Sequence, residues 1–509
     1  MRRERIDIAL LYPSPRNVAY SSIAFHLLRG YLEESGVRHA AYFLEDGKLI
    51  AERPSPPPSE ARIILVSLPY ELLYIDLVRA LDEAGIPVWA KDRREGPVIV
   101  AGGPAVTANP LPLYGIVDAF LIGEAEPVLE AIIEASFQGD VKESLADAGL
   151  LVPGLRDRVR RIYVKNLDEA WYPIVQRVPR DVEPVWGRSF MLETTRGCGR
   201  MCRFCMEGTI FRPKRDRSFH TLKHMLEEGV EVNKVGKVSF YSLAFFDSPH
   251  AQRILEHAVS LGLEVSVPSL RAETITEERA RLIAEGGQKS ITIAPETGSC
   301  RLGAAINKCI GREGALAAVE EAIRGGIRKV KLYIIVGFPH ENQDDIRETV
   351  DMIREASKIT ARNGGSLSVS INPFIPKPVT AMQWAGLEDL AVLRSKIAYV
   401  SKESRKAGAR ASTYDPRWAV AQTILSRGGP EVAKLIVEWA RSGGGLGGLR
   451  RAQRLAGIRV EEYLAEKPPE WDPPWHEVVE HPYARLEHLR REYQLYLRLA
   501  SREEPFKVS

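Results

Sequence analysis

The chain contains little cysteine, with 5 Cys in 509 residues. Small secreted domains held by disulfides need far more, so this composition indicates reduced thiols and a cytoplasmic protein. A run of about 18 apolar residues is also missing, so we expect no transmembrane segment. The apolar stretch near the start is cut short by Asp7 and Pro13. It is too short for a signal peptide and typical of a first strand.

A strong charge imbalance is absent as well, because the formal net charge is only +3. No basic run with interleaved aromatic residues occurs, so the sequence has no clear nucleic-acid signature. With 45% hydrophobic and 27% charged residues, the composition is that of an ordinary globular protein. Its length exceeds what one hydrophobic core supports and predicts about three domains.

The sequence pattern of residues 1–136 predicts a first domain. Short apolar strands are expected at residues 7–12, 62–67, 98–101 and 119–122, and amphipathic helices at 21–34, 72–84 and 127–135. Alternation of strand and helix predicts an α/β fold with a doubly wound parallel sheet.

Sheets of this kind bind ligands outside the carboxyl ends of their strands. The loops expected there are candidate binding segments, and glycines within them let a backbone come close to a ligand. Because many α/β domains end strands in glycine, packing explains these loops about equally well. The candidate residues are Ser67, Tyr70, Glu71, Gly102, Gly103, Gly123 and Glu124.

Residues 137–188 have poor helical periodicity and prolines near their end, which predicts a connector. In residues 189–385 the alternation resumes, with strands expected at 190–193, 237–241, 264–268, 290–294, 329–336 and 366–372. Six strand-helix units predict a partial (β/α)6 barrel, whose chemistry lies at the carboxyl ends of the strands. Residues 386–509 predict a mainly helical C-terminal domain.

Three of the five cysteines form the motif C-x-x-x-C-x-x-C at Cys198, Cys202 and Cys205. At this chain's Cys frequency, a given Cys has both such partners by chance roughly once in 10⁴. Three thiolates can hold a four-iron cluster and leave one iron open to another ligand. A structural zinc site usually has a fourth Cys or His, and no His occurs nearby before His220. Free thiols are the other alternative.

Cys300 and Cys309 lie farther along the chain. A second cluster would need more ligands, so we expect buried or partly buried free thiols there.

The cysteine motif, with Phe204 before its last Cys and an apolar strand leading into it, resembles that of the radical S-adenosylmethionine (SAM) enzymes. The resemblance implies a 4Fe–4S cluster held by these cysteines, whose open iron chelates SAM. One electron then cleaves SAM to a deoxyadenosyl radical.

Further segments resemble those that contact SAM in this family. Glu296, in Pro-Glu-Thr-Gly-Ser, resembles the family's PE-x-GS segment, and Gly337 and Phe338, after Val336, resemble its G-(L/F)-P-x-E segment. Arg271 ends the third strand, where it can pair with the SAM carboxylate or form an ion pair at the barrel mouth. In most proteins a residue such as Glu296 forms a salt bridge, and residues such as Val336 and Phe338 pack in the core. The segment beginning at Asn372 also resembles this subgroup.

Gly-Gly-Pro and Gly-Glu-x-Glu after two N-terminal strands, ahead of the cysteine motif, resemble the Rossmann-like domain of cobalamin-binding radical SAM enzymes. The resemblance implies cobalamin as a third cofactor. The motif Asp-x-His-x-x-Gly is absent, so the cobalt would lack that motif's histidine on its lower face, where Tyr70 or Glu71 could lie.

The resemblance implies functionalisation of an unactivated C–H bond, most simply C-methylation, with a ferredoxin or flavodoxin as electron donor. Radical C–C bond formation on a lipid chain, as in archaeal tetraether ring-forming enzymes, stays an alternative, as does a metal-stapled binding module without activity. A methylthio-transferring enzyme would need a second three-Cys cluster, and residues 1–190 contain no Cys. The substrate, whether lipid, peptide or small molecule, is left open.

Overall fold

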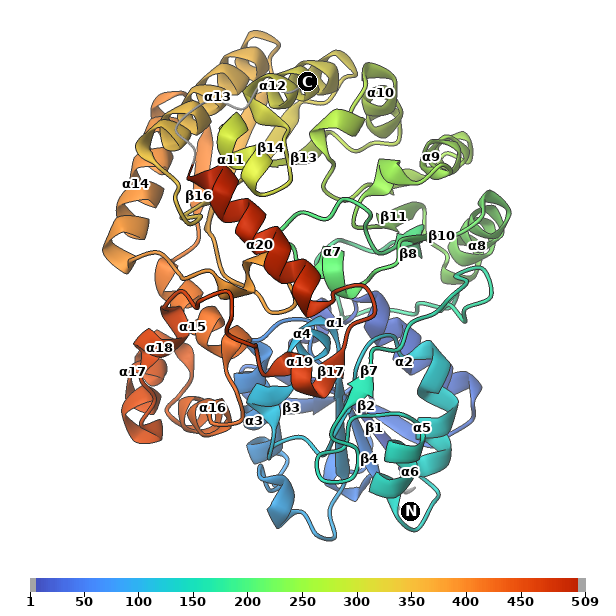
Figure 1. Cartoon of the computed structure of the whole chain (residues 1–509). Helices are drawn as coiled ribbons and strands as arrows, with labels where there is room; N and C mark the ends of the chain where they lie inside the picture. The colour runs from blue at the N-terminus through green and yellow to red at the C-terminus, as the bar shows by residue number, and fades with distance from the viewer. Residues whose placement is uncertain (1–5, 502–509) are drawn as a thin grey trace. The chain divides into compact units, whose positions relative to one another are not determined.

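The computed structural model describes residues 6–501, which fold into two compact units. Figure 1 traces the chain through both. Unit 1 contains the described residues up to Arg188, Ala421–Tyr463 and Asp472–Arg485. Unit 2 contains Ser189–Val420, Leu464–Trp471 and the described residues from Leu486 onward.

Unit 1 is built on a six-stranded sheet in the order β3-β2-β1-β4-β5-β6. Its strands are β1 (Ile8–Tyr12), β2 (His39–Glu45), β3 (Lys48–Ala51), β4 (Ile63–Ser67), β5 (Val98–Gly102) and β6 (Ala119–Leu121). Every residue of β1 and β4 is buried, as in central strands of a parallel sheet covered on both faces. Only β3 is antiparallel. The predicted doubly wound sheet is confirmed, and β2 and β3 are additional to the predicted strands.

The helices of unit 1 supply the rest of its core. They are α1 (Arg16–Ala19), α2 (Ile23–Glu34), α3 (Leu73–Glu83), α4 (Pro104–Ala108), α5 (Leu129–Ala135), α6 (Val141–Asp147), α16 (Val432–Arg441), α17 (Gly445–Ala456) and α19 (Trp475–Val478), with short 3-10 turns η1 (Pro58–Glu60), η2 (Ala90–Asp92), η3 (Leu111–Leu113) and η4 (Glu126–Val128). α16 packs against α3, and an ion pair of 2.9 Å joins Arg441 to Asp82. This packing explains why part of the helical C-terminal region belongs to unit 1.

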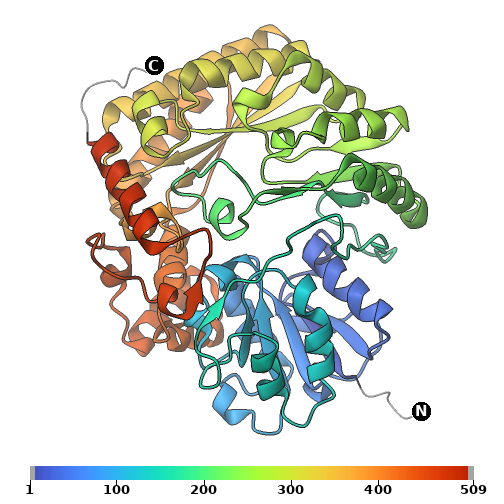
Figure 2. The ribbon, with the colours of Figure 1, turned by 45° about the vertical axis from the view of Figure 1, so that its right-hand side comes forward.

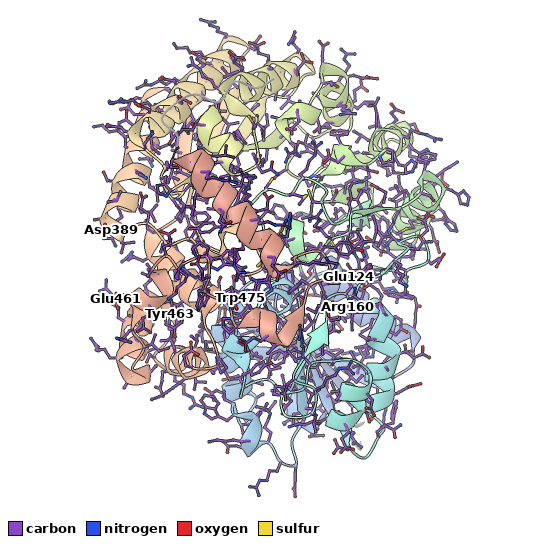
Figure 3. The ribbon with its side chains drawn as sticks, viewed as in Figure 1. Glu124, Arg160, Asp389, Glu461, Tyr463 and Trp475 are labelled. Atoms are coloured by element: carbon purple, nitrogen blue, oxygen red, sulfur yellow. The ribbon has the colours of Figure 1, made fainter. Side chains whose placement is uncertain are left out.

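The segment expected as a connector also belongs to unit 1. Its strand β7 (Val159–Arg160) pairs in parallel with β17 (Val479–Glu480). Arg160 and the fully buried Trp475, which precedes β17, are labelled in Figure 3. After β7, the chain passes the carboxyl end of β6, where Ile162 forms a bridge with Gly123.

Unit 2 contains the predicted partial barrel. Its parallel strands are β8 (Phe190–Glu193), β11 (Lys237–Tyr241), β12 (Glu264–Ser266), β13 (Ser290–Glu296), β14 (Lys329–Val336), β15 (Ser366–Pro373) and β16 (Arg410–Thr413). They form two sheets, β12-β11-β8 and β13-β14-β15-β16. A parallel bridge between Leu270 and Ile293 links the two. All six predicted strands are present, and the short, mostly exposed β16 adds a seventh.

Helices follow the strands of unit 2. They are α7 (Glu207–Ile210), α8 (Phe219–Asn233), α9 (Ala251–Ser260), α10 (Glu277–Glu285), α11 (Cys300–Ala305), α12 (Gly311–Arg324), α13 (Gln343–Arg362) and α14 (Leu390–Lys406), with turns η5 (Phe245–Asp247), η6 (Ala272–Thr274) and η7 (Ala381–Trp384) and a hairpin of β9 (Thr195–Arg196) and β10 (Arg215–Asp216). α13 begins with a capping box in which Asn342 and Asp345 bind each other's backbone N–H groups. Helices α12, α13 and α14 pack on one face of the β13–β16 sheet (Figure 2).

The C-terminal region links back to unit 2 through α20 (Leu486–Ala500), while α15 (Pro416–Arg427) and α18 (Val460–Leu464) cross the boundaries of the units. α20 packs on α11 and η7, and the ring of Tyr493 stacks on Trp384. Residues 386–501 are therefore mainly helical, as predicted, but both units share them. Within residues 6–501, no helix combines the length and apolarity needed to cross a bilayer.

Candidate functional site

The cysteine loop of unit 2 begins directly after β8, at the carboxyl end of a barrel strand. Glu193 closes β8 and accepts hydrogen bonds from Arg196 and Arg217. Gly197 then turns the chain at φ +84°, where a Cβ would lie 2.4 Å from the carbonyl oxygen of Phe211. The loop therefore needs glycine here and is fixed to the barrel at its start.

The loop brings Cys198, Cys202 and Cys205 together. A Cβ on Gly208 would lie 3.3 Å from Cys205 Sγ and 4.0 Å from Cys198 Cβ, so both cysteines flank one point. The Gly208 N–H donates to Cys205 Sγ at 3.2 Å. Burial raises the pKa of Cys205 to about 12 and also raises the pKa of Cys202. Such thiols become ligands when a bound cation stabilises the thiolates.

This donor set fits a cubane cluster. Three soft thiolates on one loop match iron, and in a four-iron cluster each binds a different iron. Within residues 6–501, no three His, Cys, Asp or Glu side chains lie close enough together to surround one metal ion. The cysteines would hold three irons and leave the fourth open.

Two cations lie beside Cys202. Arg271 Nη1 lies 3.8 Å from Cys202 Sγ, and Arg271 also binds the Glu273 carboxylate. The buried Lys308 lies 2.8 Å from Glu296, and both cations counteract the burial that raises the pKa of Cys202. Lys308 was not among the sequence candidates, because a single lysine distant from any motif gives no signal of such a role.

Other contacts hold the backbone of the cysteine loop. The Arg203 N–H donates to Ile306 O at 3.0 Å, and its guanidinium donates to Ala305 O and pairs with Glu492 of α20. Asn307 Nδ2 donates to Met201 O at 3.0 Å. The loop is therefore fixed by the end of α11 and by the C-terminal helix.

The structure places the predicted SAM-contacting residues in two groups. Arg271 and Glu296 lie with the cysteine loop, and Glu296 takes the left-handed conformation at φ +68°, a strained position for a residue other than glycine. Phe338 also contacts the cysteine loop, through the ring of Phe204, but it is buried together with Val336 and packs on Phe374. Asn372 is half-buried on β15.

Gly337 has a structural role of its own. Its φ is +88°, and a Cβ there would lie 2.7 Å from Leu393 Cδ1. Its N–H donates to Glu341 Oε2 at 2.7 Å. Lys396 binds the same oxygen at 3.1 Å and Glu388 at 2.5 Å. Burial raises the pKa of Glu341 to about 7, the Glu388 carboxylate adds to the increase, and Lys396 opposes it.

The predicted ligand loops of unit 1 are largely occupied by the chain itself. A Cβ on Gly103 would lie 2.6 Å from Leu68 O, and one on Gly123 would lie 2.0 Å from Ile162 O. Glu124, labelled in Figure 3, accepts the Val164 N–H at 2.8 Å. The glycines are therefore required by the protein's own backbone.

The remaining candidates at this edge differ in exposure. Glu71 is buried and accepts a hydrogen bond from Ser426 Oγ at 2.7 Å. Gly102 packs against Leu121. Ser67 ends β4 and is buried, whereas the Tyr70 side chain beyond it is 47% exposed. The strand order changes direction between β1 and β4, so these two residues lie where doubly wound sheets bind ligands.

Cys300 and Cys309 are free, as expected, but the expectation of burial is wrong because both are exposed. Cys300 starts α11 at its solvent side.

Comparisons with known proteins agree with this geometry. The model of the radical SAM superfamily matches residues 192–353, and that of the N-terminal region of radical SAM proteins matches residues 42–163. An uncharacterized protein of Methanocaldococcus jannaschii is 32% identical over 84% of this chain and 90% of its own length. An uncharacterized methyltransferase of Pyrococcus horikoshii is 26% identical over 52% of this chain and 60% of its own.

Among solved structures, the radical SAM methyltransferase TsrM of Kitasatospora setae, with cobalamin and a 4Fe–4S cluster bound, has a TM-score of 0.50. It shares 15% identity, with 97% of this chain and 99% of that chain covered. This likeness is one of fold.

The chain belongs to the radical SAM superfamily. Its fold is similar to that of a cobalamin-dependent member, which confirms the family resemblance and the predicted fold class. A radical SAM enzyme uses a 4Fe–4S cluster and SAM, so the structural zinc site and the inactive binding module are set aside.

Proposed function

We propose that the chain is a cobalamin-dependent radical SAM enzyme that methylates an unactivated carbon of its substrate. The observation that carries the proposal is the convergence of Cys198, Cys202 and Cys205 at the carboxyl ends of the barrel strands. The N-terminal sheet ahead of that barrel, with the fold of TsrM, supports the cobalamin assignment. The Pyrococcus horikoshii relative named as a methyltransferase supports the reaction.

When bound, the cluster and SAM supply a deoxyadenosyl radical that removes a hydrogen atom, and cobalamin supplies the methyl group. The three cysteines would hold the cluster. Arg271 and Lys308 place positive charge beside Cys202, which favours both the thiolate and a reduced, more negative cluster. Glu296, held by Lys308, presents a carboxylate suited to the SAM amino group or ribose.

On unit 1, the exposed Tyr70 and the adjacent Ser67 are the candidates we keep for cobalamin contact. Tyr70 offers an aromatic face and a hydroxyl at the β1/β4 crossing point. Other backbone lies against Gly103 and Gly123, and Glu71 and Glu124 are hydrogen-bonded within the chain. These four residues would support the loops of the site without contacting cobalamin. Gly102 stays a candidate for close backbone approach.

The reaction also requires a one-electron donor, and we propose a cytoplasmic ferredoxin or flavodoxin. The substrate must reach the same barrel mouth, since a short-lived radical is used only by a neighbouring group.

The test uses anaerobically purified, cluster-reconstituted protein. We expect it to bind hydroxocobalamin, and to transfer the label of methyl-labelled SAM to a component of cell extract. A Tyr70→Ala variant should weaken cobalamin binding, whereas Tyr399→Ala, an exposed tyrosine on α14, should not. A product that has lost the mass of hydrogen and carries no methyl label would indicate radical C–C bond formation instead. Protein that cleaves SAM but never binds a corrinoid would contradict the cobalamin assignment alone.

A further inference from the structure

The inner face of the barrel sheet differs in chemistry from its outer face. Along β14 and β15, alternate residues are buried beneath α12, α13 and α14, because successive side chains of a strand point to opposite faces. The residues between them are half-buried. On β14 these are Lys331, Tyr333 and Ile335, and on β15 they are Ser368, Ser370 and Asn372.

Strand register aligns these side chains into rows across the sheet. One row contains Thr292, Lys331, Ser368 and Arg410. The next row toward the carboxyl ends contains Tyr333, Ser370 and Ser412. Ile335 and Asn372 follow, one residue before the strand ends. The rows thus lead from the amino-terminal half of the strands, where Lys331 lies, to the carboxyl ends that carry the cysteine loop.

A closed eight-stranded barrel fills its interior with layers of Val, Ile and Leu. Here the corresponding positions are mainly hydroxyl, amide and cationic groups that remain accessible to water. The Ser368 and Ser412 hydroxyls donate only long hydrogen bonds of 3.5 and 3.4 Å to backbone carbonyls. Covering them and the Lys331 ammonium group with a hydrocarbon chain would remove water without supplying better partners, which is costly. The inner face is therefore suited to a polar molecule.

Its charge is positive. The Lys331 ammonium group lies 4.7 Å from the centre of the Tyr333 ring. Within residues 6–501, neither Lys331 nor Arg410 makes an ion pair with a carboxylate, and their row contains no acidic residue. Lys396 of the same unit, in contrast, binds two carboxylates. The inner face thus leaves two cations without a negative partner.

We infer that the substrate of this barrel is a polar molecule of metabolite size whose carboxylate or phosphate group pairs with Lys331. The inference rests on the proposed function, because it names the substrate class of the same site. Ser368 and Thr292 flank Lys331 and donate to the oxygens of the anionic group, as hydroxyls beside a cation do. The substrate's reacting carbon then lies toward Asn372 and the strand ends.

Two measurements test the inference. First, citrate and inorganic pyrophosphate are titrated into the full chain as anionic probes. Lys331→Gln should weaken their binding roughly tenfold or more, since a charge-assisted contact is lost. Lys358→Gln removes the same charge from an exposed site on α13 and should change little. Equal binding to all three proteins would overturn the inference, and this outcome does not depend on SAM chemistry.

Second, cell extract is divided into an organic phase, macromolecules, and small anions retained on an anion exchanger. Each fraction is added to reconstituted enzyme with methyl-labelled SAM. Only the small anions should stimulate deoxyadenosine formation and accept label, and Lys331→Gln should raise their KM whereas Lys358→Gln should not. Stimulation by the organic phase or by macromolecules would overturn the inference. Failure of every fraction to accept label, with probe binding intact, would contradict the proposed methylation instead.

Discussion

The strand-end loops of the two units look alike in sequence and differ in the structure. In unit 1, Gly103 and Gly123 are approached by Leu68 and Ile162, so the chain fills its own glycine sites. In unit 2, the loop after β8 instead carries three neighbouring cysteines, with Arg271 and Lys308 beside Cys202. A glycine after a strand therefore shows that some backbone passes closely, and only the surrounding side chains show whether a ligand site exists.

The largest expected effect concerns the thiols of unit 2. Replacing any one of Cys198, Cys202 or Cys205 by Ala should remove the cluster and lower SAM cleavage by more than roughly 100-fold, because even changes behind metal ligands cost 10- to 100-fold. Iron and sulfide content per chain, together with deoxyadenosine formation, measure this. Cys300→Ala is the matched control, since that thiol is exposed and free. A cluster that survives in Cys202→Ala would contradict the assigned ligands.

The next effect concerns the filled glycines of unit 1. Gly123→Ala forces a Cβ to within 2.0 Å of Ile162 O at φ +118°, and should destabilise unit 1 by ~3 kcal/mol or more. Gly85→Ala is the control that measures the cost of the backbone conformation without a steric clash. The φ of Gly85 is +65° and no atom lies within 4 Å of an added Cβ, so a destabilisation of about 1 kcal/mol is expected. Denaturant unfolding gives both values. Iron content should stay unchanged in both variants. A loss of iron would contradict the view that these glycines stabilise unit 1 and the cysteines of unit 2 hold the cluster.

The third expected effect is a pH dependence. The pKa of Glu341 is about 7 in the folded protein and 4.5 as its ordinary value. The folded state therefore favours the protonated carboxyl, and this contribution to stability is present below pH 4.5 and lost as the pH rises through about 7. Glu341→Gln should lack this part of the pH dependence.

Unfolding free energies of wild type and Glu341→Gln, measured from pH 4.5 to 8, give the difference curve. The exposed Glu231→Gln on α8 serves as the control. A difference that does not change with pH would show that Glu341 titrates normally.

Much of this architecture is predictable from the sequence. Strands such as residues 237–241 and 329–336 have the same bounds in the structure, because apolar runs between turn residues mark buried parallel strands. The grouping of Cys198, Cys202 and Cys205 on one loop follows from their spacing, and their role as cluster ligands stays a prediction. The sequence did not predict β2, because His39, two alanines and a terminal Glu weaken its strand pattern. It did not predict β16 either, because the residues of that strand are mostly exposed.

The partners of individual side chains are less predictable. The contact between Lys308 and Glu296, 12 positions apart, depends on the turn after α11, and the filling of Gly123 depends on Ile162, 39 positions away. The mixed membership of the C-terminal helices is likewise set by tertiary packing, as for α16 on α3. Periodicity identifies the helix and its buried face but not the surface it covers.

One assay decides whether three sulfur ligands leave an iron that binds and activates SAM. Protein reconstituted anaerobically to about four irons per chain is reduced by a strong reductant and given SAM. We predict release of methionine and deoxyadenosine in equal amounts, absent in Cys202→Ala. Fully loaded, reduced protein that returns SAM intact would contradict the account.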